Sequence, residues 1–248
     1  MSTWQEWWLD IKNLFLPIFC RQCGVRLMTE ENGYFCPTCW EASPRVERPF
    51  CTGCGKPHEA AVGIATRSNF PCAECRNKPN RYVRRIFGAG VYDGPVAEAV
   101  KLLKFGERLK LAGPLSELMT EFAARELDVD QYTALVPVPL HKVRQRERGF
   151  NQSLLLAAGA LPAFPHAELD TSLLRIRPTR TQSRLKAEER AANVRGAFAV
   201  VGDSLKGKTV LLIDDVVTTG GTITECARAM RRAGAVEVDV FAAALAVH

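Results

Sequence analysis

The sequence has no apolar run long enough to cross a bilayer, which needs about 20 consecutive apolar residues. Its apolar runs, such as Leu14–Phe19, end far short of that length. Residues 1–10 contain no lysine or arginine ahead of their apolar side chains, so we expect no secretory signal. These absences predict a cytoplasmic globular protein without a transmembrane segment. A content of 47% apolar and 24% charged residues is ordinary for that class.

Acidic residues are scarce in one long segment. Residues 134–195 contain eleven lysines and arginines against five acids, so this segment carries the whole net charge of +6. A concentrated positive surface attracts polyanions, for example a pyrophosphate group or a nucleic-acid backbone. A basic surface that only contacts solvent is the alternative, and the charge count alone leaves it open.

Eight of the nine cysteines form four pairs with Cys-x-x-Cys spacing: Cys20/Cys23, Cys36/Cys39, Cys51/Cys54 and Cys72/Cys75. Two such turns separated by a short hairpin are the ligand set of a zinc ribbon, so we predict one or two structural Zn²⁺ ions. The simplest pairing joins the first two pairs in one site and the last two in another. An interleaved pairing, or a single occupied site, stays open. A disulfide scaffold would need an oxidising compartment, which the expected location does not supply.

We expect two domains. Residues 1–80 combine a Trp-rich amphipathic helix with the zinc module, and residues 81–248 form an α/β domain. In the second domain, strands expected at residues 86–92, 134–138, 210–213 and 236–247 alternate with helices expected at residues 95–105, 114–127, 151–160 and 222–233. Such alternation predicts a parallel sheet covered by helices, with ligands bound outside the carboxyl ends of the strands.

The most informative stretch reads Val-Leu-Leu-Ile-Asp-Asp-Val-Val-Thr-Thr-Gly-Gly-Thr and covers residues 210–222. Its apolar start predicts a buried strand that ends at Asp214 and Asp215, followed by a turn and a helix. The first N–H groups of a helix bind anions, and glycines let a backbone approach a ligand closely, so the turn suits a phosphate monoester. A Walker loop would carry a lysine here, and this loop has none. Carboxylates beside a phosphate make sense if the ligand also has hydroxyls, as a ribose does.

This stretch resembles the phosphoribosyl-pyrophosphate motif of type I phosphoribosyltransferases. Further pieces occur in a fixed order along the chain: Tyr92-Asp-Gly94, Lys101–Gly106, Pro137-Val-Pro-Leu-His141, Arg148-Gly-Phe-Asn-Gln152 and Thr179–Asn193. With the cysteine pairs upstream, the chain resembles the ComF/GntX family, which joins a zinc-ribbon head to a phosphoribosyltransferase domain. The resemblance covers nearly everything from Phe19 onward. It implies a type I phosphoribosyltransferase-like fold, α/β with helices on both faces of a parallel sheet, plus a small zinc-ribbon module.

The resemblance also implies roles for individual residues. Asp214 and Asp215 would hold the ribose 2′- and 3′-hydroxyls, and Thr218–Thr222 the 5′-phosphate, with Mg²⁺ arriving with phosphoribosyl pyrophosphate. The implied binding set is Asp214, Asp215, Val216, Val217, Thr218, Thr219, Gly220, Gly221, Thr222, Pro139, His141 and Lys142. The implied catalytic set is Asp214, Asp215, Arg177 and Arg180, the two arginines lying in a loop that would close over the sugar.

Two functions stay open on this basis. The family's link to natural competence implies handling of internalised single-stranded DNA beside a competence helicase. The alternative is an active phosphoribosyltransferase that uses an unidentified nitrogen acceptor and is unrelated to DNA. The sequence names no acceptor, because the hood element expected at Arg84–Leu127 carries no base-reading signature.

Overall fold

The computed structural model describes residues 17–27, 34–58, 68–106, 108–178 and 194–247. The predicted Trp-rich helix lies outside these residues. None of the described helices is both long enough and apolar enough to cross a membrane.

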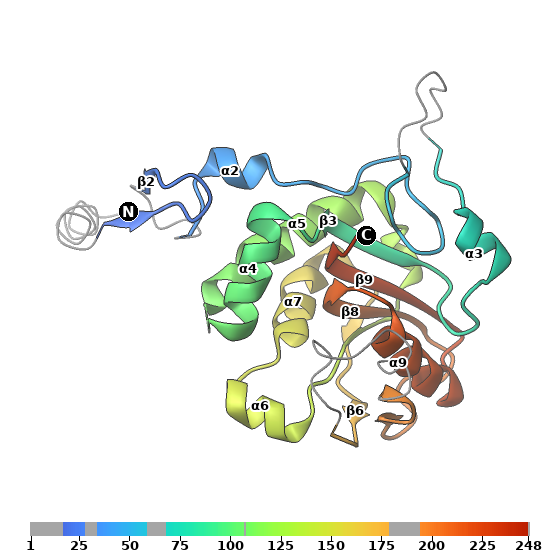
Figure 1. Ribbon diagram of the computed structural model, residues 1–248. Helices are drawn as coiled ribbons and strands as arrows, with labels where there is room; N and C mark the ends of the chain where they lie inside the picture. The colour runs from blue at the N-terminus through green and yellow to red at the C-terminus, as the bar shows by residue number, and fades with distance from the viewer. Residues whose placement is uncertain (1–16, 28–33, 59–67, 107, 179–193, 248) are drawn as a thin grey trace.

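A five-stranded parallel sheet forms the centre of the C-terminal part (Figure 1). In spatial order its strands are β3 (Ile86–Val91), β9 (Glu237–Leu245), β8 (Thr209–Val217), β4 (Ala134–Pro137) and β5 (Glu168–Leu169). All four neighbouring pairs run parallel. Nearly every residue of the central strands β8 and β9 is buried, as expected when helices cover both faces of a parallel sheet. The predicted fold class is therefore confirmed.

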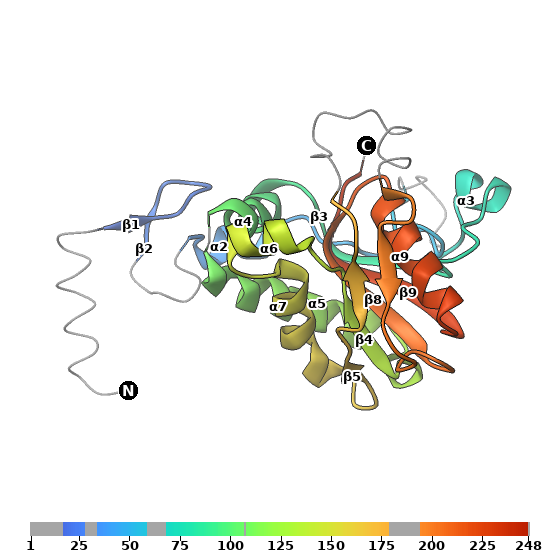
Figure 2. The same cartoon turned by 90° about the horizontal axis from the view of Figure 1, so that it is seen from below.

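Helices cover the two faces unequally (Figure 2). On one face, α5 (Ala112–Glu126) and α7 (Gln152–Ala160) pack against each other and against the sheet. On the other face lies α9 (Gly221–Arg232), next to a short antiparallel ribbon. The remaining elements of this part are α4 (Gly94–Phe105), α6 (Lys142–Arg148), β6 (Leu173–Arg175), β7 (Phe198–Val200) and the 3-10 turns Leu109–Leu111, Val129–Gln131 and Leu161–Ala163.

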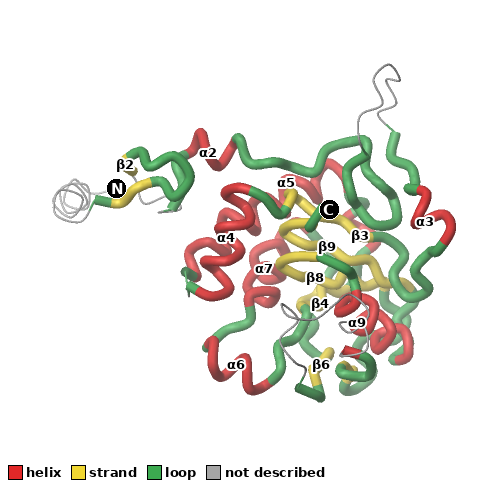
Figure 3. Tube along the Cα trace, in the orientation of Figure 1, coloured by secondary structure: helices red, strands yellow, loops and turns green. Residues whose placement is uncertain are grey.

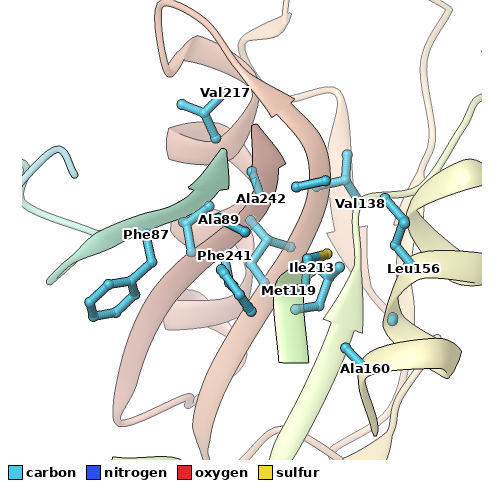
Figure 4. Close-up of a cluster of buried hydrophobic side chains, with 14 of the residues drawn as sticks. Phe87, Ala89, Met119, Val138, Leu156, Ala160, Ile213, Val217, Phe241 and Ala242 are labelled. Carbon is cyan, nitrogen blue, oxygen red and sulfur yellow. The ribbon is translucent and has the colours of Figure 1, made fainter. Parts of the chain in front are cut away.

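The core lies between the sheet and the helices α5 and α7. Figure 4 shows Phe87, Met119, Ile213 and Phe241 among the buried side chains there. Aromatic rings continue this layer, because the Phe122 and Phe241 rings lie with their centroids 5.7 Å apart.

The central strand β8 is longer than the sequence predicts. It does not end at Asp214 but continues to Val217, because β9 pairs with it as far as Val217 and Leu245. On its other side β4 stops at Pro137, opposite Ile213, and Pro139 has no N–H with which to continue the ladder. The predicted strand end was wrong for β8, and the end of the neighbouring strand β4 is what places the acids at an opening.

The cysteine-rich part contains little regular structure (Figure 3). Its described elements are β1 (Ile18–Phe19), β2 (Arg26–Leu27), α2 (Pro37–Glu41) and α3 (Ala73–Asn77). The segment after α2 joins the sheet, since Val46 N–H donates to the Ala89 carbonyl and Ile86 N–H donates to the Gly53 carbonyl. The predicted domain boundary at residue 80 stays a prediction, but the second half of the cysteine-rich part shares a core with the sheet.

Phe50 is the side chain that makes this connection. It is 2% exposed, and its ring centroid lies 5.9 Å from that of Phe122. Phe50→Ala should lower the free energy of unfolding by about 3–5 kcal/mol, measured by urea denaturation, because it leaves a cavity where the two regions meet. Phe105, which is 74% exposed, is the control, and Phe105→Ala should cost less than about 1 kcal/mol. Equal effects of the two changes would show that Phe50 does not couple the regions.

Candidate functional site

A crevice opens where the carboxyl ends of β4 and β8 meet. The chain leaves β4 toward α6 and α7, and it leaves β8 toward α9, which covers the opposite face of the sheet. Adjacent strands whose connections leave on opposite faces form the usual ligand site of an open α/β sheet. Here they enclose a cavity of about 340 Å³.

One wall of this cavity is the turn after β8, Thr218–Gly220, and the first residues of α9. Gly220 is the N-cap of α9 and has a φ of 76°, in the left-handed region that glycine adopts without strain. Thr224 N–H makes a helical hydrogen bond to the Gly220 carbonyl, which fixes the direction of the helix start. The N-terminus of a twelve-residue helix therefore faces the cavity and favours an anion there.

The floor is formed by the two acids, which are almost fully buried at 8% and 3% exposure for Asp214 and Asp215. Asp214 Oδ1 accepts hydrogen bonds from Ser153 Oγ at 3.0 Å and from the Asp215 N–H at 2.9 Å. Asp215 Oδ1 accepts a hydrogen bond from Gln152 Nε2 at 3.4 Å. Asn151 holds this segment in place, because its side chain caps α7 through the Ser153 N–H. The start of α7 thus supports both carboxylates from behind.

Two cations complete the surroundings of the acids. Lys104, from α4, places its Nζ 2.5 Å from Asp215 Oδ2. Arg148, from α6, donates from Nη1 to Gln152 Oε1 at 2.6 Å and lies over the Phe105 ring at 5.5 Å. Each buried acid therefore has a polar partner, and the Lys104 charge offsets part of the cost of burying two carboxylates side by side.

The surroundings change the pKa of Asp214 and of Lys104. Burial, and after it the neighbouring Asp215 carboxylate, raise the pKa of Asp214 to about 8. Burial lowers the pKa of Lys104, but its attraction to Asp215 outweighs burial and leaves the pKa raised. At neutral pH the Asp214 carboxyl is therefore largely protonated, beside the contact of Lys104 with Asp215.

The structure brings most of the predicted binding residues together. The predicted residues that line the cavity are Pro139, Asp214, Asp215, Val216, Val217, Thr218, Thr219, Gly220, Gly221 and Thr222. His141 and Lys142 are not among the described lining residues. His141 instead caps α6, since its Nδ1 accepts from the Val143 N–H at 3.4 Å, and Lys142 is exposed at the start of that helix.

The predicted catalytic arginines are placed differently. The Arg177 guanidinium donates to the Arg195 carbonyl and does not belong to the described lining, while Arg180 lies outside the described residues. Their predicted roles, and those of His141 and Lys142, stay predictions.

Several lining residues carry no role in the sequence prediction, above all Lys104 and Gln152. Both lie in family-like pieces, Lys101–Gly106 and Arg148–Gln152, so the sequence marked the segments without showing what they contact. The expected hood at Arg84–Leu127 is mostly part of the sheet layer, because β3 is an edge strand and α5 packs on it. Among the described residues of this range, the cavity is lined by Tyr92, Lys104 and Phe105.

The eight paired cysteines form two tetrads, as the simplest pairing predicts. One consists of Cys20, Cys23, Cys36 and Cys39, and the other of Cys51, Cys54, Cys72 and Cys75. Within each tetrad the sulfur atoms all lie within 4.8 Å of one another, and all eight are free thiols. Contacts such as Cys23 Sγ to Cys36 Sγ at 3.8 Å and Cys54 Sγ to Cys72 Sγ at 4.0 Å match the edge of about 3.8 Å expected for a Zn–S bond of about 2.3 Å. Both donor sets therefore fit structural Zn²⁺.

The backbone around each tetrad favours a thiolate. Three N–H groups, those of Cys72, Gly53 and Cys54, donate to Cys51 Sγ at 3.2–3.4 Å. Burial raises the pKa of the Cys51 thiol, but these donors outweigh burial and lower the pKa to about 6. The same balance lowers the pKa of Cys20 to about 6 in the other tetrad. A deprotonated sulfur is the form that binds metal.

The two tetrads should differ in what their loss does to the rest of the chain. Cys36→Ser and Cys72→Ser should each remove one zinc per chain, counted by metal analysis. In calorimetry, Cys36→Ser should shift the unfolding midpoint of the sheet by less than about 2 °C, and Cys72→Ser should lower it by about 5 °C or more, because the second tetrad's segment hydrogen-bonds to the sheet strand β3, whereas the first tetrad's segment packs on the outer helix α4. Equal shifts would contradict this difference, and disulfides in place of zinc would contradict the metal sites.

The raised pKa of Asp214 makes stability depend on pH. Because the folded-state pKa of about 8 lies above the unfolded value of 3.8, the contribution is fully present below about pH 4 and is lost as the pH rises through 8. Asp214→Asn imitates the protonated form, so at pH 9 it should be more stable than the wild type by about 1–3 kcal/mol, with a smaller difference at pH 5. The control is Asp203→Asn, the same substitution at an exposed position. Parallel pH profiles for the Asp214→Asn variant and the wild type would contradict the assignment.

Comparison with sequence families agrees with this geometry at both ends of the chain. Residues 163–246 match the family described as phosphoribosyl transferase domain, a range that includes β8, the turn after it and α9. Residues 11–76 match the family described as double zinc ribbon domain, which includes both tetrads.

Whole-length relatives match as well. The DNA utilization protein YhgH of Escherichia coli (strain K12) is 34% identical over 232 residues, covering 92% of this chain and 97% of that protein. Competence protein F of Haemophilus influenzae is 27% identical over 237 residues, covering 94% and 99%. Competence protein ComFC of Bacillus subtilis is 27% identical over 205 residues, covering 80% and 78%.

Similarity to solved structures is weaker. The chain aligns with a glutamine phosphoribosylpyrophosphate amidotransferase from B. subtilis at a TM-score of 0.40 and 20% identity, covering 58% of this chain and less than a third, 30%, of that one. That likeness is too low to support an argument about this chain. The relatives of near-equal length and the two domain matches suffice: the chain belongs to the ComF/GntX family of phosphoribosyltransferase-like proteins with an N-terminal double zinc ribbon.

Proposed function

We propose that the cavity at the ends of β4 and β8 binds phosphoribosyl pyrophosphate together with Mg²⁺. The observation that carries this proposal is the set of charged groups that line one cavity. A helix N-terminus, two buried acids and the arginines Arg144, Arg148 and Arg175 all line it. A ligand that carries a monophosphate, ribose hydroxyls and a diphosphate matches that set of groups.

Each part of the ligand has a matching partner. The loop Thr218–Thr222 takes the 5′-phosphate through backbone N–H groups and threonine hydroxyls. Asp214 and Asp215 accept the ribose hydroxyls, for which Asp215 exchanges its contact with Lys104. The arginines take the diphosphate, since guanidinium groups bind phosphates bidentately. Mg²⁺ arrives with the diphosphate and neutralises its charge, as expected for a hard cation with few protein ligands.

The role proposed for this site is in the use of incoming DNA. The relatives named for DNA utilization and competence cover nearly the whole chain, which supports the assignment. The basic helix α6 borders the cavity and exposes Lys142 and Arg146, so a strand could pass beside the bound sugar. Contacts to its phosphates would make the affinity steeply salt-dependent.

Calorimetric titration with phosphoribosyl pyrophosphate and Mg²⁺ tests the ligand. Asp214→Asn combined with Asp215→Asn should weaken binding at least about 100-fold, because the carboxyl groups that accept hydrogen bonds from the ribose hydroxyls are lost. Asp203→Asn removes one exposed carboxylate outside the cavity and should leave the affinity unchanged. Gly221→Leu should also abolish binding by blocking close approach to the backbone.

Unchanged affinity in the double Asn variant would reject the site. Pyrophosphate release, followed in the same samples with candidate bases, separates an active transferase from a binding protein. For the DNA role, a single-stranded oligonucleotide should bind at low salt and lose most of its affinity between about 50 and 200 mM salt. An oligonucleotide that fails to bind at low salt would leave the ligand site intact and remove the DNA role.

A further inference from the structure

A second and larger cavity, of about 720 Å³, lies on the other side of the phosphate loop. Its walls come from three places: the second cysteine tetrad, the start of β3, and the start of α9. Figures 1 and 2 both show α3, which contains Cys75 of that tetrad and begins after Cys72, on the same side of the molecule as α9. Residues 217–220 line this cavity as well as the first one, so a single stretch of backbone separates the two.

Four cations and one acid line this second cavity: Lys56, Lys78, Arg84, Arg85 and Glu74. Lys56 follows the Cys51/Cys54 turn and Lys78 follows α3, and within the described parts of the chain no carboxylate pairs with either. The two arginines of the lining are occupied, because Arg84 and Arg85 both contact the buried Asp239, at 2.6 Å and 3.4 Å. The lysines therefore supply the free positive charge, one from each side of the tetrad.

The rest of the lining suits a flat, partly apolar group. Val83, Ile86 and Leu245 are buried and contribute aliphatic surface. The rim is closed by Asn80, whose Nδ2 donates to Thr224 Oγ1 at 2.9 Å. Cavities of about 300–1,000 Å³ with apolar surface and a few fixed polar groups are typical of small-ligand sites. Two cations beside such a surface match a phosphate attached to a base and sugar.

We infer that this second cavity binds a nucleoside monophosphate unit, with its phosphate at Lys56 and Lys78 and its base against Val83, Ile86 and Leu245. The unit can be a free nucleotide or the terminal nucleotide of a single strand, which present the same chemistry. The site is separate from the phosphoribosyl-pyrophosphate cavity, so both ligands bind at once.

The shared wall couples the two sites. A ligand in either cavity contacts residues 217–220 and limits the conformations of that loop, so each ligand changes the affinity of the other by the same factor. This coupling rests on the proposed function, whereas the nucleotide site itself does not. The affinity of the nucleotide site beside the zinc-ribbon module thus depends on whether phosphoribosyl pyrophosphate occupies the phosphate loop.

The test uses the full-length, zinc-loaded chain, with thymidine 5′-monophosphate and a 5′-phosphorylated oligothymidine as probes. Lys56→Glu combined with Lys78→Glu should weaken both probes at least tenfold, while Lys56→Arg with Lys78→Arg should retain binding. The control, Lys206→Glu with Arg232→Glu, makes the same change in charge at exposed positions before β8 and at the end of α9, and it should have no effect. Zinc content confirms the fold, and the neutral pair Lys56→Gln with Lys78→Gln replaces the Glu pair if zinc is lost.

Three outcomes would each overturn the inference. The control variant loses as much affinity for the probes as the lysine variants do, the lysine variants lose no affinity, or phosphoribosyl pyrophosphate displaces the nucleotide. Simultaneous binding, with each ligand shifting the other's affinity about fivefold or more, supports it. Equal affinity for the two probes would show that a free nucleotide is a sufficient ligand. Tighter binding of the oligothymidine would identify the end of a single strand as the ligand. If the full-length chain binds the nucleotide probes but not phosphoribosyl pyrophosphate, the proposed function is rejected and the nucleotide site is retained.

Discussion

The unequal length of two neighbouring strands determines the rest of this structure. β8 stays paired with β9 as far as Val217, but its other neighbour β4 ends at Pro137, opposite Ile213. The last residues of β8 therefore keep a regular backbone while one edge loses its partner. An extended, rigid strand beside an open edge holds two acids in place and still leaves room for a ligand. A strand that simply ended at the acids would leave them on a mobile turn.

The acids at this edge are tolerated because their surroundings share the cost of burial. Two adjacent carboxylates in a buried site repel each other. A proton on Asp214, the charge of Lys104 and hydrogen bonds from two side chains of α7 reduce this repulsion. Lys104 comes from α4, which is far from β8 in the sequence. The floor of the cavity is therefore complete only when elements from three parts of the chain have met, which makes the site a product of the whole domain.

Local patterns in the sequence predicted much of the fold and of the candidate site. The Cys-x-x-Cys spacing predicted both tetrads, and the strand–turn–helix pattern at residues 210–233 predicted β8, the turn after it and α9. Pairing across long sequence distances could not be predicted, because periodicity says nothing about which strand lies beside which. The extension of β8, the contact of Lys104 with Asp215, and the packing of Phe50 on Phe122 all depend on such pairing. The role of His141 as a helix cap is local, but a histidine looks the same in a cap and in a binding loop.

The packing of Phe50 on Phe122 also affects the order in which parts of the chain can assemble during synthesis. A ribosome releases the chain from its N-terminus, so the ligands Cys20–Cys39 are all available when little else exists. The second tetrad, Cys51–Cys75, is also made early, but the surface on which its segment packs belongs to α5 and β3 and is synthesised later. During synthesis all four ligands of each tetrad therefore exist before the elements that cover their segments, which are α4 for the first segment and α5 with β3 for the second.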